Sequence, residues 1–75
     1  MTSTDLWYAQ ERVTEFIRDR KRVSFDEIYR HNYKYVISKE ALDSILWILV
    51  HCEFVTEEII NHRKYYTWIF EGDIT

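Results

Sequence analysis

The sequence predicts an α+β fold in which three helices precede a two-stranded antiparallel hairpin. Ser24 and Ser38 each stand directly before a segment with helical apolar spacing, and a serine at that place can accept a hydrogen bond from a free amide of the first helical turn. Two runs rich in β-branched and aromatic residues, 54–60 and 64–70, then flank a polar turn at 61–63. Residues 1–75 are expected to form one domain, because no proline and no glycine-rich linker divides the chain.

The first helix is expected over residues 5–21. Apolar residues recur there at the three- and four-residue spacing of one helix face, and the predicted buried face consists of Leu6, Ala9, Val13, Phe16 and Ile17. Trp7 and Tyr8 point away from that face, roughly 100° and 200° round the helix from Leu6. These two aromatic side chains are therefore the candidate interface of a homodimer.

The second and third helices are expected over residues 25–32 and 39–52. Glu27 follows Ser24 by three residues, which is the spacing of a capping box. In the third helix the predicted core stripe is Leu42, Ile45, Leu46, Leu49 and Val50, and the opposite arc carries Glu40, Asp43, Ser44, Trp47 and His51. Trp47 is thus expected in the middle of the solvent-facing side of this helix.

Length and composition predict self-association. A chain of 75 residues buries only about 60% of the surface that its unfolded form exposes. Hydrophobic residues make up 47% of the chain, with three Trp, six Tyr and four Phe, and this is more apolar surface than a small monomer easily hides. Some of these aromatic side chains are expected to face a partner.

The charge is unevenly distributed along the chain. The net charge of −3 argues against a general polyanion binder, but residues 18–35 and 61–64 are both basic, so a nucleic-acid surface would have to be local. The basic run at 18–22 has two interpretations that the sequence leaves open. Its cations are favoured at the C-terminus of a helix, and they can equally contact phosphates.

Several classes of protein are excluded by what the sequence lacks. No apolar run is long enough to span a membrane, and the first residues do not have the layout of a signal peptide, so an intracellular, cytoplasmic protein is expected. His51 and Cys52 point about 100° apart on a helix and cannot hold one metal ion together. No phosphate-binding loop, paired-carboxylate arrangement or catalytic triad motif is present. We therefore expect no enzyme activity, no metal and no cofactor.

Three stretches resemble the winged helix-turn-helix family of small DNA-binding transcriptional regulators. Residues 38–46, with the sequence Ser-Lys-Glu-Ala-Leu-Asp-Ser-Ile-Leu, are similar to the start of the recognition helix of that family. Residues 50–55 resemble its helix-to-strand corner, although Glu53 stands where the family commonly has glycine, and residues 63–66 resemble its wing. In size and composition the chain is similar to the free-standing members found in archaea and their viruses.

The resemblance implies a dimeric regulator of transcription that binds specific sequences of double-stranded DNA. In the family, the outward face of the third helix reads base edges in the major groove while the wing and nearby cations hold phosphates. On this chain, base-edge contacts would fall to the outward arc of that helix, including Lys39, Ser44 and Trp47. Phosphate contacts would fall to Arg30, Lys34, His62, Arg63 and Lys64.

A second interpretation stays open for Trp47 and for the function as a whole. Glu40 and Asp43 repel phosphates, and tryptophan is enriched in protein interfaces. The Trp47 face is therefore also consistent with a protein–protein interaction module in a transcription, replication or virus–host complex. Trp47 can alternatively contact a second copy of the chain, or cover the aromatic link at residues 33–37.

Overall fold

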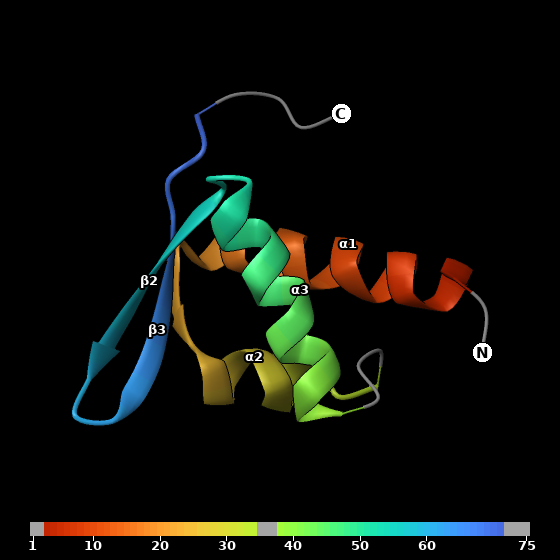
Figure 1. Cartoon of the computed structure of the whole chain (residues 1–75), viewed down its shortest axis with the longest axis horizontal. Helices are drawn as coiled ribbons and strands as arrows, with labels where there is room; N and C mark the ends of the chain where they lie inside the picture. The colour runs from red at the N-terminus through yellow and green to blue at the C-terminus, as the bar shows by residue number, and fades with distance from the viewer. Residues whose placement is uncertain (1–2, 35–37, 72–75) are drawn as a thin grey trace.

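A computed structural model describes residues 3–34 and 38–71 of the chain (Figure 1). The fold is α+β, with three helices and a three-stranded antiparallel sheet. The elements in chain order are α1 (Ser3–Arg20), β1 (Arg22–Ser24), α2 (Phe25–Asn32), α3 (Lys39–His51), β2 (Val55–Ile60) and β3 (Arg63–Trp68). Among these described residues, no helix combines the length and the apolar character needed to cross a membrane.

Both serine caps are confirmed. The Ser24 hydroxyl accepts a hydrogen bond from the Glu27 amide at 3.2 Å, and the Glu27 carboxylate accepts one from the Ser24 amide at 3.4 Å, so the predicted capping box is complete. The Ser38 hydroxyl accepts from the Ala41 amide at 3.2 Å. These bonds satisfy amides that have no partner inside the helix, and α2 and α3 therefore begin at the predicted residues.

The predicted antiparallel hairpin is present as β2 and β3, but the sheet also contains a third strand, β1, which precedes α2 and was not predicted. In the strand order β1-β3-β2, Val23 of β1 lies opposite Tyr66 of β3. A strand of three residues is too short to show an alternating pattern, and its partner lies at the other end of the chain. The hairpin turn is also shorter than predicted, since Arg63 already belongs to β3 and the turn consists of Asn61 and His62.

The core lies between the three helices and one face of the sheet. Its fully buried members come from all six elements and are Ala9, Val13, Ile17, Val23, Ile28, Leu42, Ile45, Leu46, Leu49, Val55 and Tyr66. Most of the predicted stripe positions are confirmed, while Phe16 and Val50 are partly buried at the edge of the core. The side chain of Leu6 lies outside the described part of the structure.

The corner between α3 and β2 shows why glycine is common at such a position. Glu53 has a φ of 63°, in the left-handed region, where a Cβ atom is disfavoured. The Glu53 amide donates to the Val50 carbonyl at 3.1 Å, and the Phe54 amide donates to the Leu49 carbonyl at 3.0 Å. This pair of bonds is a Schellman motif, and it directs the chain from the helix into β2.

Candidate nucleic-acid interface

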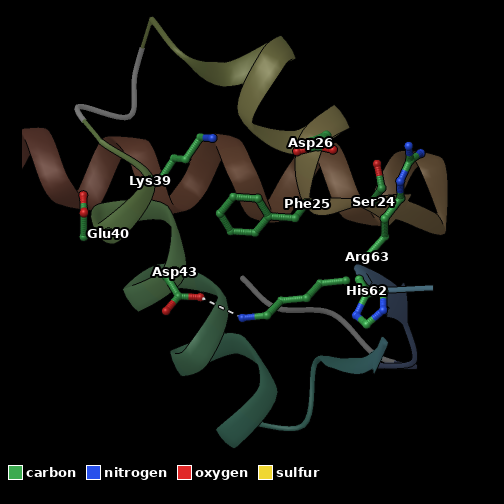
Figure 2. A pocket seen from close by; sticks show the side chains of 9 residues that line it. Ser24, Phe25, Asp26, Lys39, Glu40, Asp43, His62 and Arg63 are labelled. Carbon is green, nitrogen blue, oxygen red and sulfur yellow. Dashed lines mark ion pairs between the residues drawn. The ribbon is translucent and has the colours of Figure 1, made fainter. Parts of the chain in front are cut away.

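A cleft of about 410 Å³ lies where the first turns of α2 and α3 face the tip of the β2–β3 hairpin. In Figure 2 the Phe25 ring lies in the middle of the view, with Lys39, Glu40 and Asp43 on one side and His62 and Arg63 on the other. The full lining is Ser24, Phe25, Asp26, Lys39, Glu40, Asp43, His62, Arg63 and Lys64. The cleft is thus built from three segments that are distant in sequence.

Local structure fixes each of these segments. The two serine caps set the starts of α2 and α3, so the first-turn side chains of both helices have defined directions. Asn61 and His62 have φ values of 51° and 66°, and positive φ at both central residues is typical of the type I′ turn that matches the twist of a hairpin. Arg63 and Lys64 follow directly and are paired with Ile60 and Ile59 of β2.

The cleft combines opposite charges rather than presenting a basic surface. Its lining contains three cations and three acidic side chains, so it carries no net charge with His62 neutral. The Lys64 Nζ atom lies 3.6 Å from Asp43 Oδ1, and the Lys39 Nζ atom lies 5.7 Å from the centre of the Tyr29 ring. Both lysines therefore have contacts within the protein that a phosphate would have to replace or share.

The structure brings four of the eight predicted DNA-contacting residues to this cleft, namely Lys39, His62, Arg63 and Lys64. Ser44 and Trp47 lie on the exposed side of α3 in a neighbouring hollow of about 320 Å³, which Asp43 shares with the cleft. Arg30 and Lys34 are exposed but line neither the cleft nor the neighbouring hollow. Six of the predicted contact residues therefore lie on one surface that includes the cleft and the hollow beside it, while Arg30 and Lys34 lie apart from it.

Trp47 lies in the solvent as predicted, with 61% of its surface exposed. Its ring stacks on the His51 ring at a centroid distance of 3.8 Å, and His51 Nδ1 lies 3.1 Å from the Trp47 carbonyl oxygen. Residues 35–37 of the aromatic link that Trp47 was expected to cover lie outside the described residues. The neighbouring turn of α3 therefore holds the indole in place while one side stays open.

The aromatic pair on α1 is also exposed, at 68% for Trp7 and 50% for Tyr8. Trp7 borders a hollow of about 200 Å³ to which Leu49 of α3 and Phe54 also contribute. Both side chains thus point away from the core, as the helical spacing predicted. Their contact with a second copy stays a prediction.

The basic run at 18–22 is partly engaged within the protein. The Arg22 guanidinium lies 2.6 Å from Glu58 Oε1 and 5.2 Å from the centre of the Tyr65 ring. Arg20 lies 4.0 Å from Glu27 and stacks over Phe16 at 4.7 Å. These contacts connect α1 and β1 to α2 and the outer face of the sheet, which favours a structural role for Arg20 and Arg22.

Sequence reasoning missed the part of the cleft that α2 contributes. Phe25 is partly buried against the core and Asp26 is exposed, and both also line the cleft. The capping box placed both residues in the first turn of α2, but its sequence carries no signal that the hairpin tip lies opposite. Among the described residues, no three His, Cys, Asp or Glu side chains are grouped so that they could hold a metal ion.

Comparison of the chain with protein-family models, with curated proteins and with solved structures found no match. The functional argument therefore depends on the residues and geometry described above.

Proposed function

We propose that the protein is a sequence-specific, double-stranded DNA-binding transcriptional regulator of the winged helix-turn-helix type. One observation carries the proposal: the cations at the hairpin tip and the exposed first turns of α3 border the same cleft. In the winged-helix arrangement the third helix enters the major groove and the hairpin, as the wing, contacts the flanking backbone. The element order of helix, strand, two helices and two strands supports this assignment.

In this proposal the two sides of the cleft have different tasks. Lys39 and Ser44 contact base edges, and the carboxylates of Glu40 and Asp43 accept hydrogen bonds from the amino group of cytosine. Arg63 and Lys64 neutralise phosphates without reading the sequence. Because the acidic side chains repel the backbone, phosphate contacts are few and the affinity is modest and dependent on salt.

Titration of labelled duplex DNA with the protein at about 50 and 200 mM salt tests the proposal, because phosphate neutralisation makes binding weaken as salt rises. The Arg63→Ala/Lys64→Ala variant should bind all sequences more weakly and show a flatter salt dependence. A control is Arg12→Ala, which removes a cation of α1 that belongs neither to the basic run at 18–22 nor to the lining of the cleft. If the hairpin variant binds as tightly as the parent at low salt, the proposal is wrong.

Base reading is tested separately by selection from a pool of random duplexes. The Lys39→Ala and Ser44→Ala variants should prefer different sequences from the parent, because these side chains lie on the exposed first turns of α3. Loss of a good bidentate base contact costs about 1–3 kcal/mol of discrimination. An unchanged preference in both variants would show that the α3 face does not read bases.

We further propose that the regulator is a homodimer formed through α1. The support is the exposure of Trp7 and Tyr8 on a domain whose core is already filled from other positions, since large exposed aromatics are typical of interfaces. Sedimentation at micromolar concentration should give the mass of a dimer for the parent and of a monomer for Trp7→Ala. Trp47→Ala is the comparison, because it removes a similarly exposed tryptophan from α3, and a monomer for that variant alone would place the interface on α3 instead. A monomeric parent would contradict this part of the proposal.

A protein–protein interaction module is the second candidate function, and the exposed Trp47 beside Asp43 favours it. In a module of that kind Trp47→Ala should abolish partner capture, because a buried aromatic anchor often contributes 2 kcal/mol or more, roughly a thirtyfold change in affinity. In a DNA-binding regulator the same variant should change DNA affinity modestly. The two readouts on one variant therefore separate the candidates.

A further inference from the structure

The strand β2 forms a free edge of the sheet. In the order β1-β3-β2 no strand lies beyond it among the described residues, and Val55 is its only buried member. The Trp68 amide donates to the Lys21 carbonyl at 2.7 Å, away from β2. Val55 lies opposite Trp68 and therefore makes no ladder bond to β3, because hydrogen-bonded and non-bonded pairs alternate in an antiparallel pair. The backbone N–H and C=O groups that point to the free edge are thus those of Val55, Glu57 and Ile59.

The part of this edge next to the turn is apolar. Ile59 and Ile60 end β2, and 65% and 42% of their surfaces are exposed. Glu57 and Glu58 precede them in the middle of the strand. Charged side chains on an edge strand oppose pairing with another edge, and the two glutamates supply such a barrier where the isoleucines do not. The hairpin tip is therefore the part of the edge that is open to pairing.

The backbone restricts how a second copy of the chain can pair with this edge. Ladder bonds form only if the edge-directed residues of one copy lie opposite the edge-directed residues of the other. These residues are every second residue of β2, so in an antiparallel two-fold pair one residue must lie opposite its own copy. Directly opposite side chains then share a face of the sheet, and the helices of both copies lie on the same side.

Only one such register suits the side chains. A centre at Glu57 or Glu58 sets like charges directly opposite each other, which is destabilising. Centres nearer the start of β2 leave both isoleucines outside the paired segment, and a centre at Ile60 sets Ile59 opposite the turn. A centre at Ile59 pairs this residue with its own copy through two backbone hydrogen bonds and places apolar side chains against each other.

The register centred at Ile59 also brings opposite charges together on the outer face of the sheet. Ile60 lies opposite Arg63 in its own hairpin and would lie opposite Glu58 of the second copy. Arg63 and that glutamate would thus flank the same isoleucine, and the two-fold axis repeats the arrangement. Two strand spacings, about 9–10 Å, separate their Cα atoms, which two long side chains can span across the isoleucine.

We propose that the hairpin tips of two copies pair edge to edge, with Ile59 opposite its own copy, and join two three-stranded sheets into one of six strands. A second copy is the partner because this chain's own residues then meet apolar against apolar and charge against opposite charge. In Figure 1 the hairpin projects from the helices at its turn end, which leaves the tip accessible to another hairpin. The contact involves residues 58–60 of each copy, so it is small, weak and dependent on concentration. It rests neither on DNA binding nor on the contact proposed for α1.

Disulfide trapping tests this register. In the proposed pair the two Cα atoms of residue 59 lie about 5.5 Å apart, a separation that a disulfide can bridge. The background is Cys52→Ser, which removes the exposed native thiol. Under mild oxidation at micromolar concentration, Ile59→Cys should form a covalent dimer about tenfold faster, or more, than Ile69→Cys, because paired edges raise the effective concentration of the two thiols. Ile69 is the matched control, since it is 46% exposed and lies beyond the end of β3.

A second substitution at the neighbouring position tests the charges. Adding Ile60→Glu to the Ile59→Cys protein sets like charges opposite each other between copies while keeping an opposite charge beside Arg63 within the hairpin. Trapping should fall to the rate of the Ile69→Cys control. Adding Ile60→Lys instead should slow trapping less, because the lysine faces Glu58 of the second copy. Circular dichroism checks that each variant is folded.

The remaining outcomes decide against the proposal. It is overturned if Ile59→Cys is trapped no faster than Ile69→Cys, or if Glu57→Cys or Glu58→Cys is trapped faster than Ile59→Cys. Equal rates with Ile60→Glu and Ile60→Lys would also overturn it. Adding Trp7→Ala should leave the rate unchanged, and a loss of trapping would show that the tips meet only where α1 has already joined two copies. A failed DNA titration would not affect this contact.

Discussion

At the scale of single residues, the chain uses left-handed backbone where one element gives way to the next. Among the described residues, positive φ values occur at Lys21, Glu53, Asn61 and His62. Lys21 directly follows α1, and its amide donates to the Ile17 carbonyl at 2.7 Å. Lysine and glutamate seldom adopt this conformation. The turn after α1 at Lys21 and the turn after α3 at Glu53 therefore each cost the protein some stability.

Replacing Glu53 by glycine should therefore stabilise the protein. Removing the Cβ atom relieves a left-handed strain of about 1–2 kcal/mol, while the greater freedom of glycine in the unfolded chain takes back about 0.4–1 kcal/mol. Urea denaturation should show a free energy of unfolding about 0.5–1 kcal/mol above that of the parent. The Glu53→Val variant should be less stable than the parent, and equal stability of the two variants would contradict the strain argument.

Tyr66 should make the stability fall in alkaline solution. Burial and the hydrogen bond to Glu57 at 2.8 Å raise the pKa of the Tyr66 hydroxyl well above its ordinary value of 10.0. Above about pH 10 the unfolded chain loses this proton while the folded protein keeps it, so the unfolded state binds fewer protons and the free energy of unfolding decreases as pH rises. The full contribution is present below pH 10, and the slope reaches at most about 1.4 kcal/mol per pH unit.

The Tyr66→Phe variant provides the control for this pH dependence. It loses the hydrogen bond to Glu57 and should be about 1 kcal/mol less stable at neutral pH. Above pH 10 its free energy of unfolding should decrease less steeply than that of the parent. Parallel curves for the two proteins in alkaline urea denaturation would show that Tyr66 is not the responsible group.

At the scale of elements, the hairpin and α3 are connected by the contact between Lys64 and Asp43. Both side chains are about half exposed, and such a pair contributes about 0–1 kcal/mol to stability. Its larger effect is on charge, because Asp43 holds a cation that the proposed function assigns to phosphate. If the proposed function is correct, Asp43 therefore limits the affinity of the wing for DNA.

On duplex DNA of random sequence, where specific base contacts do not contribute, the Asp43→Asn variant should bind about two- to fivefold more tightly than the parent, as expected for releasing one exposed ion pair. Its salt dependence should correspond to one additional phosphate contact. Glu40→Gln is the matched control, because Glu40 lines the same cleft but does not take part in the Lys64 contact. If both variants gained DNA affinity equally, the cause would be the general loss of negative charge and not the contact between Lys64 and Asp43.

At the scale of the whole molecule, the small core leaves little reserve of stability. Leu46 is 1% exposed in a core with eleven buried hydrophobic members among the described residues. Truncating such a leucine costs about 2–5 kcal/mol, which is comparable to the total stability that a domain of this size reaches. Leu46→Ala should therefore be largely unfolded by circular dichroism at 37 °C. The exposed Ser44→Ala should differ from the parent by less than about 0.5 kcal/mol, and a cooperative native transition for Leu46→Ala would contradict the estimate.

The whole-molecule arrangement also explains why the candidate site was predicted only in part. Lys39, His62, Arg63 and Lys64 were assigned from a family resemblance, and the fold places them around one cleft. The sequence did not show that Asp26 and Phe25 would complete its lining. Helix faces can be derived from periodicity, but which face meets the hairpin depends on the packing of α2 and α3 against the sheet.

The sequence by itself determined the elements whose signals are local. The starts of α2 and α3 follow from serine hydroxyls that bond amides three residues away, and the core stripe of α3 follows from the helical period. The tertiary structure alone decided the strand β1, the neutral charge of the cleft and the pairing of Arg22 with Glu58, which are 36 residues apart. The physical reason is that a cap or a helical stripe is satisfied within one or two turns, whereas a strand pair or a cleft exists only after distant segments have packed together.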